Sequence, residues 1–183
     1  MPRRFLAGLC LSLVLSTVTE AKTPRLLVDV PIQTPEQKPI LLKKYRGQVI
    51  ILVIFSTTCD DCIAILNFMG KLQQDYGARG LQVVGAAGDA TAKYTLGPFI
   101  MRYRPVFPVG YLDQPAIMRI ADIGPGVRPI APIVLFIDRT GLVRFQYYGN
   151  DPFMKEPDKN FRGIATGLLN SSERRVVPAP QPK

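Results

Sequence analysis

The run Val49–Phe55 is the feature that most constrains the fold of this chain. It reads Val-Ile-Ile-Leu-Val-Ile-Phe, seven apolar residues with no polar residue between them. A strand with one face exposed to solvent would alternate between apolar and polar residues, whereas an unbroken apolar run is typical of a strand buried on both faces. Such a strand lies in the middle of a sheet that helices cover on each side, so the run predicts an α/β fold.

The residues that follow predict a β-α-β unit. Apolar residues recur at helical spacing at Ile63, Leu66, Met69 and Leu72. Gly77 marks the end of this helix, and residues 81–86 form a second apolar run. Two strands joined by a helix of this length are expected to be parallel, with a right-handed crossover.

The remaining elements are weaker in the sequence. We expect further helices over residues 92–103, 115–123 and 161–169, and further strands over residues 107–111, 133–138 and 143–148. Gly97 and Pro98 are expected to break or to start the first of these helices. The turn at 138–141 predicts an antiparallel hairpin, and residues 26–30 and 40–42 predict a small N-terminal β-hairpin. Together these elements predict a central mixed sheet flanked by helices.

The N-terminal segment has the pattern of an export signal. Arg3 and Arg4 precede an apolar stretch over residues 5–18, and small residues lead to a cleavage site after Ala21. Residues 1–21 are therefore expected to be a signal peptide. The alternative is an uncleaved membrane anchor, but the stretch is shorter than the ~20 residues that span a bilayer. Export to the periplasm is the expectation in either case.

The rest of the chain suits one domain. Its 183 residues show no repeat, so we expect a single domain over residues 22–170 and a disordered, proline-rich tail over 171–183. The formal net charge is +9. These charges are spread along the chain without a dense patch, so no nucleic-acid partner is expected. Attraction to acidic proteins or to an anionic membrane face remains the alternative.

The chain contains few side chains of the types that act as nucleophiles or bind transition metals. The chain has three cysteines and no histidine. Without histidine, Ser-His and Cys-His catalysis and most transition-metal sites are excluded. Cys10 lies in the expected signal, which leaves Cys59 and Cys62. A zinc site would need two more ligands, so we expect neither a metal nor another cofactor.

The spacing of Cys59 and Cys62 favours a working dithiol. Free N–H groups and the dipole at the start of a helix stabilise a thiolate, so Cys59 is the expected attacking thiol and Cys62 the resolving one. Asp60 and Asp61 oppose this by raising the pKa of the Cys59 thiol, which predicts a reducing couple. A purely structural disulfide is the alternative, although so short a loop stabilises a fold weakly.

A cysteine pair at the first strand-to-helix turn of such an order of elements is the thioredoxin arrangement. Over residues 26–169 the sequence resembles the TlpA/ResA-like thiol-disulfide oxidoreductases, within the thioredoxin and AhpC/TSA (redoxin) superfamily. The resemblance rests on residues 47–62, 76–85 and 131–141. It implies a thioredoxin-like fold and reduction of disulfides in exported proteins through a mixed disulfide at Cys59. It also implies a membrane electron donor of the DsbD/CcdA type.

The resemblance also points to a substrate site. In this family a cis proline faces the dithiol, and Pro132 stands at the matching position. The backbone of Ala131 would then pair with an extended segment of the substrate, as in β-strand addition. The competing interpretation of Pro132 is a trans proline that opens a strand.

The chain departs from the family at several positions. The tryptophan usual before the first cysteine is Thr58, and the acid that thioredoxin buries is Val53. Ile65 replaces a glutamate that is frequent in TlpA-like proteins, and Asn67 replaces a kinking proline. The sequence thus shows no proton relay for the resolving thiol. Asp89 is one candidate for that role, and a simple turn residue is the alternative.

Three other functions are less well supported. A peroxiredoxin-like peroxidase needs a proline and a threonine where Leu52 and Ser56 stand, and an arginine where Pro132 stands. A Sco-type copper chaperone needs a distal histidine. A non-catalytic binding module that uses the thioredoxin fold as a scaffold is the alternative from a different class.

Overall fold

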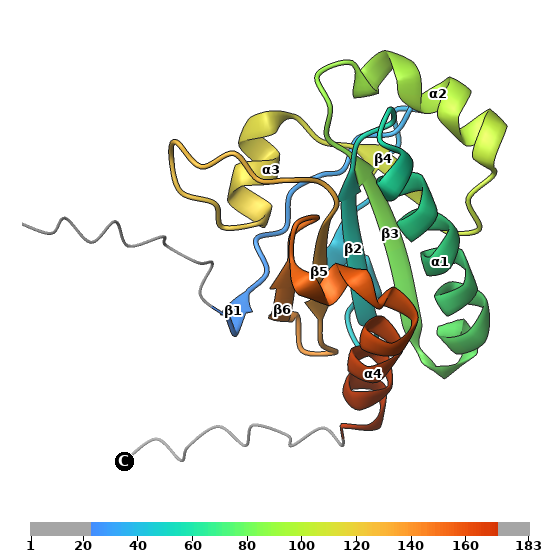
Figure 1. Cartoon of the computed structure of the whole chain (residues 1–183), viewed down its shortest axis with the longest axis vertical. Helices are drawn as coiled ribbons and strands as arrows, with labels where there is room; N and C mark the ends of the chain where they lie inside the picture. Colours follow the sequence, from blue (N-terminus) through green and yellow to red (C-terminus); the bar gives the residue numbers. More distant parts are fainter. Residues whose placement is uncertain (1–22, 172–183) are drawn as a thin grey trace, which may run out of the picture.

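The computed structural model describes residues 23–171 (Figure 1). The expected signal peptide, residues 1–21, and residues 172–183 of the expected tail lie outside this range. Within the described range, the helices are all too short or too polar to cross a membrane.

A mixed six-stranded sheet forms the centre of the molecule, as predicted. Its strands lie in the order β1-β6-β5-β2-β3-β4. They are β1 Arg25–Leu26, β2 Val49–Phe55, β3 Leu81–Ala87, β4 Val109–Tyr111, β5 Ile133–Ile137 and β6 Leu142–Tyr147. Strand β2 pairs in parallel with β3 and antiparallel with β5. The expected β-α-β unit and the expected hairpin of β5 and β6 are both present.

Helices cover both faces of this sheet (Figure 1). They are α1 Asp60–Tyr76, α2 Ala92–Tyr103, α3 Gln114–Ile120 and α4 Pro157–Asn170, with short 3-10 turns η1 Leu42–Tyr45, η2 Gly77–Arg79 and η3 Pro152–Lys155. Helices α1, α2 and α4 share one apolar core, and α3 packs in the other core with the N-terminal segment. This two-core arrangement is that of the thioredoxin-like fold.

Strand β2 explains why the sheet has two cores. Every residue of β2 is buried. Alternate side chains enter the core under α1 and α4 (Val49, Ile51, Val53, Phe55), and the others enter the core under α3 (Ile50, Leu52, Ile54). Each buried aliphatic side chain of this size contributes roughly 1.5–3 kcal/mol relative to an exposed one. Burial on both faces therefore fixes β2, and with it the turn that follows, in the middle of the molecule.

Two local expectations were wrong. Helix α2 runs without a break through Pro98. Pro98 is exposed while Leu96 and Phe99 are buried, so water can reach the helix where a backbone bond is lost, and the buried side chains hold both halves of α2. The N-terminal segment does not form the expected hairpin over 26–30 and 40–42. Strand β1 adds to the edge of β6 instead, and a single antiparallel bridge joins Ile32 to Ile40.

The turn between β5 and β6 is held by Asp138. This buried carboxylate accepts hydrogen bonds from the Thr140 N–H and hydroxyl and from the Leu142 N–H, and it pairs with Arg144. Burial alone would raise the pKa of Asp138, but these hydrogen bonds outweigh it and hold that pKa below its usual value. The ionised carboxylate therefore stabilises the hairpin, and this stabilisation is lost as the pH falls through the lowered pKa.

Candidate active site at the turn between β2 and α1

Cys59 and Cys62 meet at the first turn of α1. Cys59 is the N-cap residue, in an extended conformation, and Cys62 lies in the first helical turn. The two residues form a disulfide with their Cα atoms 5.2 Å apart. Cys62 is fully buried, whereas Cys59 is only half-buried. This difference in exposure matches the expected roles, in which Cys59 meets the substrate and Cys62 stays behind it.

The start of α1 directs positive potential at Cys59. The Cys62 N–H donates to Cys59 Sγ at 3.2 Å, the geometry of a side chain that caps a helix. In the reduced protein the same N–H group and the helix dipole would stabilise a thiolate on Cys59. Asp60 and Asp61 are exposed in that first turn, and their charges oppose this effect.

The floor beneath the dithiol is apolar. Val53, at the position of thioredoxin's buried acid, is fully buried, and Ile65 is buried one turn after Cys62. Both side chains belong to the core under α1. The two positions that would supply a carboxylate in relatives supply only packing here.

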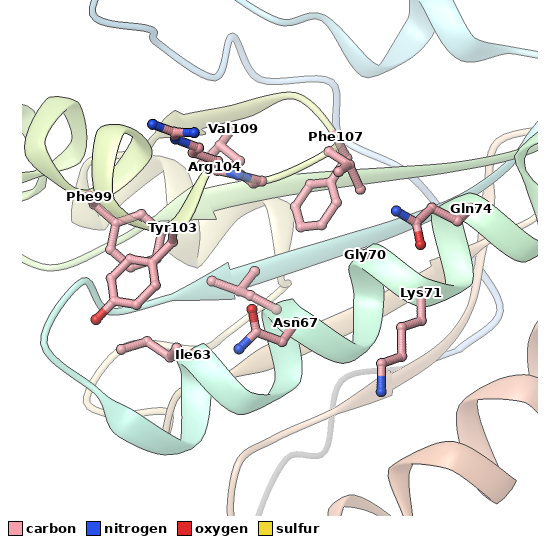
Figure 2. Close-up of a pocket in the computed structure, with 13 residues that line it drawn as sticks. Ile63, Asn67, Gly70, Lys71, Gln74, Phe99, Tyr103, Arg104, Phe107 and Val109 are labelled. Carbon is pink, nitrogen blue, oxygen red and sulfur yellow. The ribbon is translucent and has the colours of Figure 1, made fainter.

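A cavity of about 170 Å³ opens between α1 and α2, one to three turns along α1 from the dithiol (Figure 2). Ile63 and Asn67 line it on one side, and Phe99 and Tyr103 line it on the other. Asn67, which stands where relatives carry a kinking proline, is exposed and directs its amide toward α2 in Figure 2. Without the proline, α1 runs unbroken past this point.

Pro132 lies at the same end of the sheet as the dithiol. The Ala131–Pro132 peptide is cis, as the resemblance implied. Ile133 pairs with Ile54 across β5 and β2, so Pro132 comes next to the end of β2, from which the chain turns toward Cys59. Ala131 and Cys59 also pack against the same core. Antiparallel pairing thus brings together two segments that lie more than 70 residues apart in the sequence.

Asp89 belongs to this site, but in a way that the sequence did not show. Its carboxylate accepts hydrogen bonds from Thr57, two residues before Cys59. It also lines a cavity of about 200 Å³ with Ser56 and Ala131. Sequence reasoning missed Thr57 altogether, because a threonine in a short loop carries no recognisable signal. Only its position two residues after β2 could have singled it out.

Comparison with known proteins finds sequences similar to this chain among thiol-disulfide oxidoreductases. No protein-family model matches the sequence. The thiol-disulfide oxidoreductase ResA of Oceanobacillus iheyensis is 27% identical over 106 residues, which are 58% of this chain and 52% of that protein. ResA of Bacillus cereus is 27% identical over 108 residues, 59% of each chain. The chain thus matches little more than half the length of these curated relatives.

Solved structures agree on the fold. A thioredoxin-family thiol:disulfide interchange protein of Chlorobium tepidum superposes with a TM-score of 0.65 at 21% identity, covering 81% of this chain and 98% of that one. The thioredoxin domain of a thiol-disulfide oxidoreductase from Bacteroides vulgatus gives 0.63 at 11% identity, covering 80% and 98%. This chain is therefore a thioredoxin-fold protein and a divergent relative of the ResA-type thiol-disulfide oxidoreductases.

Proposed function

We propose that this protein is an exported thiol-disulfide oxidoreductase that reduces disulfides in other exported proteins. One observation carries the proposal: a disulfide-forming pair at the start of a helix, with Cys59 accessible and Cys62 fully buried behind it. A structural disulfide gains nothing from this placement. A redox dithiol needs this placement, because the Cys59 sulfur must reach the substrate, whereas the Cys62 sulfur needs to reach only Cys59.

The reaction proceeds by two exchanges. The Cys59 thiolate attacks one sulfur of a substrate disulfide; a new bond joins Cys59 to that sulfur, and the other substrate sulfur leaves as a thiolate and takes up a proton. Cys62 then loses its proton and attacks Cys59 Sγ. The Cys59–Cys62 disulfide forms, and the first substrate sulfur leaves as a second thiol. The substrate gains two electrons and two protons. The protein loses two electrons, the proton of Cys62 and the proton that Cys59 gave up when it ionised.

Ala131 and Pro132 are proposed to hold the substrate during this exchange. An extended substrate segment would pair with the Ala131 backbone, which places the substrate sulfur near Cys59. The position of Pro132 beside the end of β2, close to the turn that carries Cys59, supports this role.

The signal pattern over residues 1–21 supports export, and export requires a source of electrons outside the cytosol. We propose a membrane thiol donor of the DsbD/CcdA type, which would reduce the Cys59–Cys62 disulfide after each cycle. The substrates would be exported proteins that carry disulfides.

Insulin reduction tests the proposed activity. With dithiothreitol as the source of electrons, the wild-type protein is expected to accelerate precipitation of the insulin B chain. Cys59→Ser is expected to lower the protein-dependent rate at least ~100-fold, because it removes the attacking thiolate. Equal rates for the wild type and Cys59→Ser would refute the activity. Rapid consumption of hydrogen peroxide in a parallel assay would instead favour a peroxidase.

A further inference from the structure

Asp89, at the carboxyl end of β3, connects that strand to the loop that carries Cys59. Asp89 Oδ1 accepts the Thr57 backbone N–H at 2.8 Å, and Oδ2 accepts the Thr57 hydroxyl at 3.2 Å. Both oxygens of one carboxylate thus hold one residue. The Thr91 hydroxyl also donates to Oδ2, at 2.9 Å. Hydrogen bonds to an ionised carboxylate are stronger than neutral ones, so this is a firm attachment.

A second threonine extends the attachment to α2. The hydroxyls of Thr57 and Thr95 lie 2.9 Å apart, and Thr95 Oγ1 lies 3.2 Å from the Thr91 carbonyl oxygen. Each hydroxyl has one proton. If Thr57 gives its proton to the carboxylate, the stronger acceptor, then Thr95 donates to Thr57 rather than to the Thr91 carbonyl. The start of α2, the end of β3 and the dithiol loop are therefore joined in one network.

The loop has few other constraints. Within residues 23–171, the other hydrogen bonds of Ser56, Thr57 and Thr58 are local to the loop. The Ser56 and Thr58 hydroxyls lie 3.2 Å apart, and the Cys59 N–H donates to the Ser56 carbonyl oxygen at 3.3 Å. Thr58 is exposed and stands where relatives carry tryptophan. The loop is thus tied to the rest of the fold through Thr57 and its contacts with Asp89 and Thr95.

We propose that Asp89 is a positioning residue, which holds the loop 56–58 through Thr57 and thereby sets the reactivity of the Cys59 thiol. The inference rests on the proposed function, since it assigns a role within the same site. It also differs from the proton relay that the sequence suggested. A carboxylate that already accepts three hydrogen bonds from Thr57 and Thr91 is engaged in holding the loop.

Positioning and charge predict opposite effects for Asp89, which makes them separable. A negative charge near Cys59 disfavours its thiolate, so a role through charge alone predicts faster attack when that charge is removed. A positioning role predicts slower attack when the contacts are removed, because a shift of about 1 Å in a reacting group can cost ~100-fold in rate. Asp89→Asn removes the charge and keeps an oxygen for the Thr57 N–H. Asp89→Ala removes both.

The experiment compares Asp89→Ala, Asp89→Asn and Thr57→Val. The rate of Cys59 alkylation by iodoacetamide is measured in the reduced protein in a Cys62→Ser background, with adducts on Cys59 counted by peptide mass spectrometry. The reduction potential and the insulin activity are measured in proteins that keep Cys62. Asp89→Ala is expected to slow alkylation and insulin reduction by ~10-fold or more, and Asp89→Asn by no more than ~3-fold. Thr57→Val keeps the backbone contact and should fall between them.

Wild-type alkylation, potential and insulin activity in Asp89→Ala would overturn the inference, even if its melting temperature fell. Faster alkylation in both Asp89 variants would also overturn the inference, and would show that Asp89 acts on Cys59 through its charge alone. If Asp89→Ala does not fold, Thr57→Val tests the inference instead. A wild-type rate of Cys59 alkylation in Thr57→Val would then reject the positioning role of Asp89. The alkylation rate does not require turnover, so failure of the proposed function would show separately, as equal insulin rates in wild type and Cys59→Ser.

Discussion

Replacing Cys62 by serine is expected to turn the protein into a trap for its own substrates. The half-buried Cys59 is expected still to attack a substrate disulfide, but the buried Cys62 thiol, which is proposed to release the product, is gone. Intramolecular attack owes its speed to a high effective concentration, and no external thiol supplies that. Covalent complexes should accumulate, and insulin turnover should fall at least ~100-fold.

Non-reducing electrophoresis followed by mass spectrometry checks this result. Cys62→Ser should yield adducts that dithiothreitol releases, each joined through Cys59. The matched control is the Cys59→Ser, Cys62→Ser double variant, which should yield none at this site. Equal adduct levels in the trap and in the double variant would contradict the assignment of Cys59 as the attacking thiol.

Gly149→Ala is expected to disturb the proposed substrate site without touching either cysteine. Gly149 follows β6 and packs against the segment before β5. A Cβ at Gly149 would overlap the Ala131 carbonyl oxygen and would lie 2.7 Å from the Ala131 carbonyl carbon and 3.1 Å from Pro132 N. Backbone atoms cannot give way as a flexible side chain can, so Ala131 and Pro132 would have to move. We expect kcat/KM for insulin reduction to fall ~10- to 100-fold.

The free energy of unfolding of Gly149→Ala should fall by about 1–3 kcal/mol, as is usual for overpacking. Gly163→Ala in α4 is the matched control. A Cβ there meets nothing within 4 Å, so its activity should stay at the wild-type level and helix propensity should favour it slightly. Unchanged kcat/KM in Gly149→Ala would show that the position of Ala131 does not matter for turnover.

The centre of the fold was predictable because its signals are local. The unbroken apolar run of β2 and the helical spacing after Cys62 each lie within a short window of sequence, and the structure places both as expected. The cis peptide before Pro132 came from the resemblance. These features suffice to bring the dithiol and Pro132 to one end of the sheet.

What the sequence did not reveal depends on contacts between distant segments. Strand β1 finds its partner in β6, more than 110 residues away, and no local pattern encodes that register. The contact of Gly149 with Ala131 and the bonds from Thr57 to Asp89 and Thr95 are of the same kind. Each side chain is ordinary in its own stretch of sequence and gains its role only when the sheet assembles.

The departures from the family form a consistent set in the structure. Val53 and Ile65 fill the core beneath the dithiol with apolar atoms, in place of carboxylates. Acidic groups are found instead at the surface of the first helical turn, as Asp60 and Asp61, and beside the loop, as Asp89. Charge near the dithiol therefore comes from the start of α1 and from the loop after β3, rather than from within the core.

The reduction potential of the Cys59–Cys62 pair decides whether this pair can act as a reducing dithiol. Equilibration in glutathione or dithiothreitol buffers, read out by thiol labelling, would give the potential. The double variant Asp60→Asn, Asp61→Asn is expected to have a higher reduction potential, because it removes the negative charges that disfavour the Cys59 thiolate. We predict a reversible couple whose reduction potential is nearer to that of thioredoxin, at about −270 mV, than to that of the strong oxidant DsbA, at about −120 mV. A value near −120 mV, or a disulfide that does not exchange in these buffers, would contradict it.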